Sequence, residues 1–280
     1  MKSIVFILIA SALLSAQELN LPQRNVDASG GSNFSVSLIP LTRTDREEEI
    51  FQQVCSGNIP KFIRTFVPIE IVKEINGKTM QLKYFVAPEY LAIGHDSDYF
   101  LCPMTPFLAQ RIADSLHCTL PTKNMVDQIY KAATVKLRPQ PIPPDTDMIK
   151  VPRFIQHNDS VQSIRNPLLA TFPLGSLVAG HKKDIIIHEK IYSQLRPNRP
   201  SPVVIYGWHT AEGVPIQPPN NWHQDTYMDY SHGVRLVLTK ALLDGTEVSL
   251  IDLMRDEMYH VFITDSVLTK PYYSIPKKVE

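Results

Sequence analysis

The dipeptide Asn76-Gly77 is the strongest single constraint on how this chain folds. It separates two β-rich runs, VPIEIVKEI over 67–75 and TMQLKYFVA over 79–87. A two-residue turn between strands needs a positive φ at both positions, which Asn and Gly tolerate. We therefore predict a β-hairpin over residues 66–87, with alternate side chains on its two faces.

A proline-rich segment over 137–152 divides the chain, with five prolines and no glycine. Such a segment cannot form a helix interior or a central strand, and extended structure is expected. It either connects two domains or lies as a strap across one, with Ile142, Met148 and Val151 as apolar anchors. The predicted organisation is a signal peptide over 1–16, a flexible N-terminal arm over 17–40, an α+β region over 41–137, a connector over 138–152 and a β-rich region over 153–280.

Helix signals concentrate before residue 170. A capping box at Thr44 to Glu47 predicts a helix that Gly57 ends, and Thr105-Pro106 and Thr122 each predict a helix start. Asn158 to Ala170 indicates another helix, interrupted at Asn166-Pro167. β-branched runs follow over 184–191, 203–208, 234–239 and 247–251. The predicted class is α+β, with helices and one hairpin in the N-terminal half and a mostly antiparallel sheet in the C-terminal half.

The first sixteen residues have the composition of a secretory signal peptide. A lysine precedes an apolar run from Ile4 to Leu14, and the small pair Ser15-Ala16 follows. The run is shorter than the roughly twenty residues that cross a bilayer. We expect a secreted or periplasmic protein that does not span a membrane once this segment is removed. An uncleaved anchor and a buried first helix are the alternatives.

The charge balance and the cysteines limit which partners and which cysteine chemistry are expected. The chain has 28 basic and 28 acidic residues, and this balance argues against nucleic acid as the main partner. Cys55 is expected at a helix end, where the helix dipole would not activate it. Cys102 and Cys118 bracket one short helix and are expected either to pair in an oxidising compartment or to remain reduced.

Residues 203–238 gather three histidines, both tryptophans and three tyrosines. The motifs GHKKD, YGWH, PIQP and DYSHGVRLV resemble an uncharacterised family of exported bacterial proteins, a resemblance that carries no established activity or fold. Ser231 to Leu236 also resembles the SHGC-x-R motif of L,D-transpeptidases. That resemblance implies a base at His232 and a site-supporting Arg235. The cysteine nucleophile expected after Gly233 is absent, which argues against thioester chemistry.

The residue types in this cluster are typical of two kinds of hydrolytic site. In the first kind, a histidine oriented by an acid such as Asp225 or Asp229 is the general base, and it activates either water or Ser231. A divalent metal such as zinc needs converging histidines and carboxylates. The predicted catalytic residues are His209, His232, Asp229 and Arg235, and the predicted metal ligands are His181, Asp184 and His223.

Aromatic residues of the same cluster predict a sugar-stacking platform or, alternatively, core packing. Trp208, Trp222 and Tyr230 are the predicted substrate-binding residues. One functional hypothesis is a secreted hydrolase of an extracellular polymer, such as cell-wall glycan or peptide. The other is a non-catalytic secreted protein that binds carbohydrate or peptide. His181, Asp184, His209 and His232 are each expected at a strand end or turn beside the same sheet, so we predict that they line one cleft, as catalysis would require.

Overall fold

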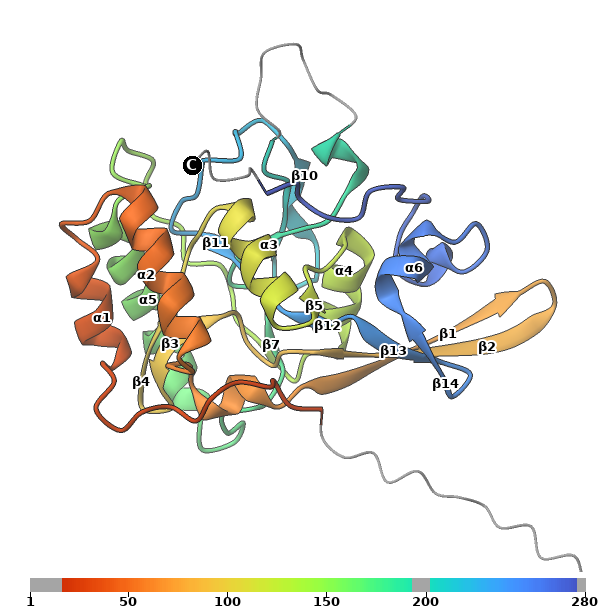
Figure 1. The fold of residues 1–280 in the computed structure, drawn as a ribbon, viewed down its shortest axis with the longest axis horizontal. Coiled ribbons are helices and arrows are strands. Elements are labelled where there is room, and N and C mark those ends of the chain that lie inside the picture. Colours follow the sequence, from red (N-terminus) through yellow and green to blue (C-terminus); the bar gives the residue numbers. More distant parts are fainter. Residues whose placement is uncertain (1–16, 193–201, 276–280) are drawn as a thin grey trace, which may run out of the picture.

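The computed structural model describes residues 17–192 and 202–275, so the predicted signal peptide lies outside the described residues. The α-helices within these ranges are α1 (Gly31–Ser37), α2 (Arg43–Cys55), α3 (Pro106–Ser115), α4 (Lys123–Ala132), α5 (Val151–Arg165) and α6 (Leu250–Arg255). α1, α2 and α5 gather at one end of the molecule, and α6 lies near the other (Figure 1). No described helix combines the length and the apolar character needed to cross a bilayer.

The strands confirm the α+β class. They are β1 (Val67–Ile75), β2 (Lys78–Val86), β3 (Ala92–His95), β4 (Asp98–Leu101), β5 (Cys118–Thr119), β6 (Val135–Lys136), β7 (Val178–Ala179), β8 (Lys183–Ile185), β9 (Ile205–His209), β10 (Pro215–Asn220), β11 (His232–Gly233), β12 (Val237–Leu238), β13 (Lys240–Leu243) and β14 (Thr246–Ser249). Short 3-10 helices cover Lys61–Arg64, Asn166–Leu168, Glu189–Ile191 and His260–Phe262.

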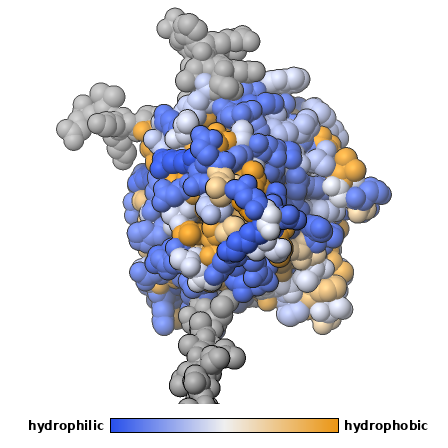
Figure 2. All heavy atoms as spheres, turned by 90° about the vertical axis from the view of Figure 1, so that its right-hand side faces the viewer, coloured by the Kyte–Doolittle hydropathy of each residue, from blue (hydrophilic) through white to orange (hydrophobic). Residues whose placement is uncertain are grey.

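The predicted hairpin is confirmed. β1 pairs antiparallel with β2 from Val67 opposite Val86 to Ile75 opposite Lys78. Asn76 and Gly77 have φ values of 52° and 78°, the left-handed conformation that the turn requires. The hairpin extends away from the helical end of the molecule (Figure 1), and the face that it borders is largely hydrophilic, with apolar side chains among the polar ones (Figure 2).

The main sheet combines strands from both halves of the sequence. Its order is β14-β13-β2-β12-β5, with β1 added beside β2. A second sheet has the order β10-β9-β8-β11, in which only the β8–β11 pair is parallel. The sequence predicted one hairpin before residue 170 and a separate sheet after it, but the main sheet pairs that hairpin and β5 with strands from the C-terminal half. Long-range pairing, which local sequence patterns do not encode, produces this mixing.

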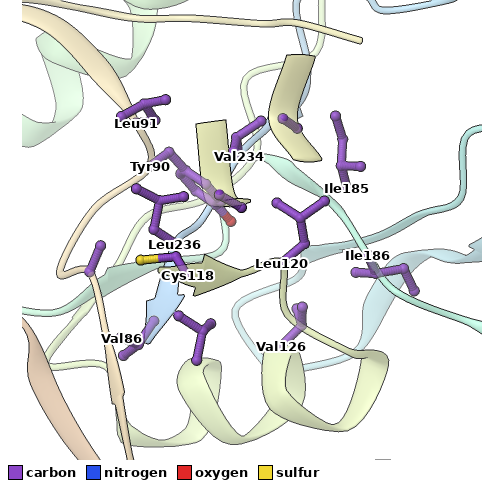
Figure 3. Close-up of a cluster of buried hydrophobic side chains, with 14 of the residues drawn as sticks. Val86, Tyr90, Leu91, Cys118, Leu120, Val126, Ile185, Ile186, Val234 and Leu236 are labelled. Carbon is purple, nitrogen blue, oxygen red and sulfur yellow. The ribbon is translucent and has the colours of Figure 1, made fainter. Parts of the chain in front are cut away.

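The hydrophobic core is built from the strands, from the loops between them and from buried faces of all the described α-helices. Figure 3 shows Val86, Leu120, Val126, Ile186 and Leu236 among its members, and all are buried. They come from segments up to 150 positions apart in the chain. Burial of such apolar surface is the main stabilising contribution to the fold.

Residues 17–40 differ from the expected flexible arm. Glu18 forms a β-bridge with Thr65, and α1 begins at Gly31. Phe34 and Leu38 are only 3% and 1% exposed. The prediction was wrong because the scattered polar residues of this segment conceal a few apolar anchors that tertiary contacts bury.

The start of α2 also differs from the expected capping box. Thr42, not Thr44, is the N-cap, and its side chain accepts a hydrogen bond from the Asp45 amide. Glu47 instead accepts bonds from the amide and hydroxyl of Thr105. A long-range partner for Glu47 thus replaces the reciprocal bond of the predicted box.

The proline-rich segment lies against the rest of the fold. The Tyr230 hydroxyl accepts a bond from the Ile142 amide at 2.9 Å and donates one to its carbonyl at 3.1 Å. The following helix begins at Val151, earlier than the expected Asn158, because Pro152 fits a first helical turn. A turn over residues 146–149 ends the extended segment, and proline in the first helical turn then starts the helix.

The cysteines are free thiols, so the expected Cys102–Cys118 pairing is not formed. Each sulfur is directed at a nearby carbonyl, that of Phe100 for Cys102 and that of Leu116 for Cys118. Burial raises the pKa of Cys102 to about 12 and also raises that of Cys118. Cys55 ends α2 as predicted, and burial raises its pKa. The cysteines are therefore protonated packing residues at neutral pH.

Candidate functional site

The second sheet positions most of the predicted site residues. β11 runs parallel to β8 with His232 opposite Lys183 and Gly233 opposite Asp184. β9 pairs antiparallel with the other edge of β8 and ends at His209. Three predicted residues from distant parts of the sequence therefore lie on adjacent strands.

Asp184 lies in a fully buried cluster with Tyr90 and Arg235. The Tyr90 hydroxyl donates to Asp184 Oδ2 at 2.7 Å, and Arg235 Nε lies 3.9 Å from Asp184 Oδ1. Arg235 also donates to the carbonyls of Ala87 and Val178, at 2.9 and 2.8 Å. Burial raises the pKa of Asp184 to about 6, although Arg235 and Tyr90 act to lower it. Arg235, predicted to be catalytic, thus joins three chain segments.

His181 lies beside this cluster. Its Nε2 is 3.2 Å from Glu89 Oε1, and its ring meets the Tyr90 ring edge-on at 5.1 Å. Both side chains of the pair are buried. Burial acts to raise the pKa of Glu89, but His181 and Arg235 outweigh it and hold the pKa below its ordinary value. Glu89 and Tyr90 carry no motif that would have revealed this role in the sequence.

His209 belongs to a different group of side chains. Its ring stacks on Tyr130 with centroids 4.3 Å apart, and its Nε2 lies 3.4 Å from Asp127 Oδ1. The Tyr206 hydroxyl donates to the same carboxylate at 2.6 Å. These two neighbours hold the pKa of Asp127 below its usual value although burial acts to raise it. The acid beside His209 is therefore Asp127 of α4, not the predicted Asp225 or Asp229.

His232 and Asp229 form a third group. His232 Nε2 lies 3.9 Å from Asp229 Oδ2, beyond hydrogen-bond distance. The Ser231 hydroxyl donates to Asp229 Oδ1 at 2.5 Å, so it is directed at the acid and not at the histidine. Burial lowers the pKa of His232 to about 4, and neither ring nitrogen has a hydrogen-bond partner among the described residues. His232 is therefore neutral at pH 7.

Two aromatic rings separate His232 from the surface. The His223 ring stacks on Tyr227 at 3.8 Å with an interplanar angle of 9°. Tyr227 in turn meets His232 edge-on at 5.7 Å, and its hydroxyl donates to Asp229 Oδ2 at 3.2 Å. Trp222, the preceding residue in the chain, is 87% exposed. Trp222, His223 and Tyr227 form what we call the aromatic strip.

The four residues predicted to line one cleft do not do so. Each of the four is at most 3% exposed, so none opens onto a cleft. His181 and Asp184 share contacts with Tyr90, and His209 acts to lower the pKa of Asp184. His232 instead contacts Tyr227 and lies near Asp229. The predicted metal ligands are also dispersed, because His223 is exposed in the aromatic strip whereas His181 and Asp184 are buried with Tyr90. Across residues 17–192 and 202–275, no three His, Cys, Asp or Glu side chains converge to hold a metal ion.

The predicted substrate-binding aromatics have different environments. Trp208 and Tyr230 are 9% and 2% exposed. The Trp208 indole donates to the His181 carbonyl at 3.1 Å, and Tyr230 bonds to the proline-rich segment. Burial and bonded polar atoms indicate packing roles for both. Trp222 alone of the three presents its ring to solvent.

An open groove of about 410 Å³ borders the aromatic strip at Tyr227. It lies between the loop before α2, the first turns of α2 and α5, and the segment before β11. Its lining residues are Ile39, Leu41, Arg43, Arg46, Ile149, Lys150, Val151, Pro152, Thr226, Tyr227 and Met228. The sequence did not reveal this groove, because its walls come from three segments of unrelated pattern. Tyr227 therefore faces the groove as well as the buried His232 and Asp229.

Comparison with protein-family models, with curated proteins and with solved structures finds no match to this chain. The site must therefore be interpreted from its own residues.

Proposed function

We propose that this chain is an exported binding protein for a peptide or carbohydrate ligand. The observation that carries the proposal is a contrast in exposure. The histidines and acids suited to catalysis are almost fully buried, whereas Trp222 and the groove beside Tyr227 are open to solvent. Catalysis on a polymer needs reactive groups that touch the substrate, and a binding protein does not.

The aromatic strip is suited to ligand contact. Trp222 adds a large exposed ring, and the stacked His223 and Tyr227 form a second flat surface. Aromatic faces bind sugar rings and peptide side chains at a low cost in conformational entropy. The groove volume lies within the usual range of ligand sites, roughly 300–1,000 Å³. The strip and the groove share Tyr227, so one ligand can contact both.

Export is the second part of the proposal. Its support is the sequence of residues 1–16, which combines a basic start, a short apolar run and a small-residue end. N-terminal sequencing of the secreted protein should find a mature start near Gln17. Recovery of cytoplasmic protein that begins at Met1 would contradict export.

Calorimetric titration tests the binding function with two probe sets, oligomers of N-acetylglucosamine and acetylated tripeptides. We expect one set to bind, and Trp222→Ala to weaken that binding roughly 10-fold, as for an exposed aromatic contact of about 1.4 kcal/mol. Met258→Ala removes a 44% exposed apolar side chain elsewhere and should have no effect. Absence of binding to every probe would contradict the proposal.

A hydrolase is the second candidate, because unpartnered buried polar atoms concentrate around the predicted catalytic residues. They include Nδ1 of His181, both ring nitrogens of His232, and Asp184 Oδ1. Such atoms in a native fold call for an explanation, and a catalytic role is one. If the wild type hydrolyses a polymer, His209→Ala and His232→Ala should each lower the rate roughly 10²-fold or more. A wild type without hydrolytic activity eliminates this candidate.

A further inference from the structure

Arg46 is a buried cation that lines the groove. Its residue is 7% exposed, and its Nε is buried without a hydrogen-bond partner among the described residues. Its nearest polar contact is a weak one, from Nη2 to Met228 Sδ at 3.8 Å. The guanidinium lies 5.3 Å from the centroid of the Phe154 ring. Because burying an unpaired charge is unfavourable, this arrangement favours a bound anion.

Among the described residues, no acid forms an ion pair with Arg46. The neighbouring Glu47 acts to raise the pKa of Arg46, but its carboxylate is bonded to the amide and hydroxyl of Thr105. Burial has the larger effect and lowers the pKa of Arg46. A guanidinium nevertheless stays protonated in proteins. Arg46 is therefore positive and available to an external anion.

The surroundings of Arg46 add positive charge. Arg43 Nη1 donates to the Thr226 carbonyl at 3.2 Å. Lys150, at the far wall, is exposed and pairs with Asp147 at 2.7 Å. Asp225 is a buried acid near Arg43, and burial raises its pKa although Arg43 acts to lower it. The groove lining itself contains three cations and no carboxylate.

The groove also exposes large apolar side chains. Ile39, Leu41 and Ile149 are 36–48% exposed, which is unusual for residues of this size on one surface. They share the groove with Arg46. A ligand that fits this lining has a negative group next to a bulky apolar group.

We propose that the groove binds the C-terminal carboxylate of a peptide whose last side chain is large and apolar. Arg46 pairs with the carboxylate through two N–H donors, the geometry that a guanidinium offers to a planar anion. The terminal side chain packs on Ile39, Leu41 and Ile149. A fatty acid is a poorer fit, because an open groove leaves much of an acyl chain in water. This inference rests on the proposed binding function and names its ligand.

The test compares acetyl-Ala-Ala-Leu with a free carboxylate and the same peptide as its amide, by calorimetric titration. The acid should bind roughly 10- to 100-fold more tightly, because hydrogen bonds to charged groups contribute about 1.5–3 kcal/mol. Arg46→Met should reduce the acid to the affinity of the amide. Arg255→Met removes an exposed arginine of α6 and should preserve the difference.

Thermal unfolding controls for damage to the fold. Arg46→Met should retain the wild-type melting temperature or raise it, since the variant buries no unpaired charge. Should it not fold, Arg46→Lys replaces it and is expected to lose most of the preference for the acid, because lysine cannot bind bidentately. The acid–amide comparison on the wild type is independent of both variants.

The remaining outcomes separate this inference from the proposed function. Equal affinity for acid and amide would overturn the carboxylate assignment while leaving peptide binding intact. Tighter binding of decanoate than of the peptide would overturn the choice of ligand. Binding of N-acetylglucosamine oligomers without any peptide would overturn the inference alone. No binding by any probe would overturn both proposals.

Discussion

Arg235 and Arg46 are both buried arginines, but their surroundings differ. Arg235 donates to two backbone carbonyls and lies beside Asp184, with its guanidinium 4.1 Å from the Tyr90 ring centroid. Within residues 17–192 and 202–275, Arg46 has no acid at ion-pair distance, and its contacts are a weak one to Met228 sulfur and the face of the Phe154 ring. Removing a buried charge whose bonds are internal leaves its partners unpaired and destabilises the fold. A buried charge without such bonds is better explained by an external partner.

The largest difference should appear in stability. Arg235→Met leaves Asp184 buried without its cation and frees two carbonyls, so the free energy of unfolding should fall by about 3–5 kcal/mol. Arg46→Met should not lower it. Denaturant titration of both variants measures the contrast. Equal losses would show that Arg46, too, is held by internal contacts.

The pH dependence of stability should separate His232 from Asp184. The pKa of His232 is about 4 in the fold against 6.5 ordinarily, so the unfolded chain binds the extra proton between these values. Its contribution to the free energy of unfolding therefore rises from pH 4 to 6.5, by at most about 3 kcal/mol.

Asp184 acts in the opposite direction. Its pKa is about 6 in the fold against 3.8, so its contribution falls as the pH rises from 4 to 6. His232→Gln removes the rising contribution of His232 and keeps the falling contribution of Asp184. The free energy of unfolding of the variant should therefore drop relative to the wild type as the pH rises from 4 to 6.5. Denaturant titration at pH 4, 5 and 6.5 measures the difference. Parallel curves would mean that His232 is not buried in its neutral form.

Gly233 tests how tightly the residues around Arg235 are packed. A Cβ there would lie 2.7 Å from Tyr90 Cδ1 and 2.8 Å from Lys182 Cβ. Gly233→Ala should therefore cost about 1–3 kcal/mol, the usual range for overpacking. Thermal unfolding provides the measurement. A variant as stable as the wild type would show that this region can adjust.

The smallest effect should come from the N-cap of α2, the helix that carries Arg46. Thr42→Ala removes the bond to the Asp45 amide and should cost about 1 kcal/mol. Thr44→Ala is the matched control, since Thr44 is exposed within the first helical turn. A larger loss from Thr44 than from Thr42 would restore the capping box that the sequence predicted.

Local chemistry in the sequence was sufficient for several elements. Asn76-Gly77 determined the hairpin because its turn geometry depends on two adjacent residues. Thr105-Pro106 and Thr122 determined two helix starts for the same reason. The strand near Asp184 was predictable only in part: the expected run reached Ile191, but β8 ends at Ile185 and residues Glu189–Ile191 form a 3-10 helix.

Only the tertiary structure decided how the chemical groups combine. Asp127 beside His209, Glu89 beside His181 and the position of Arg46 in a groove depend on contacts between distant segments. A histidine's sequence neighbours do not reveal whether burial will make it neutral or a carboxylate will face it. The hairpin turn and the caps at Thr105 and Thr122 were predictable because their energies are local. The cap of α2 and the site were not, because long-range contacts, charge, burial and access are set by the whole fold.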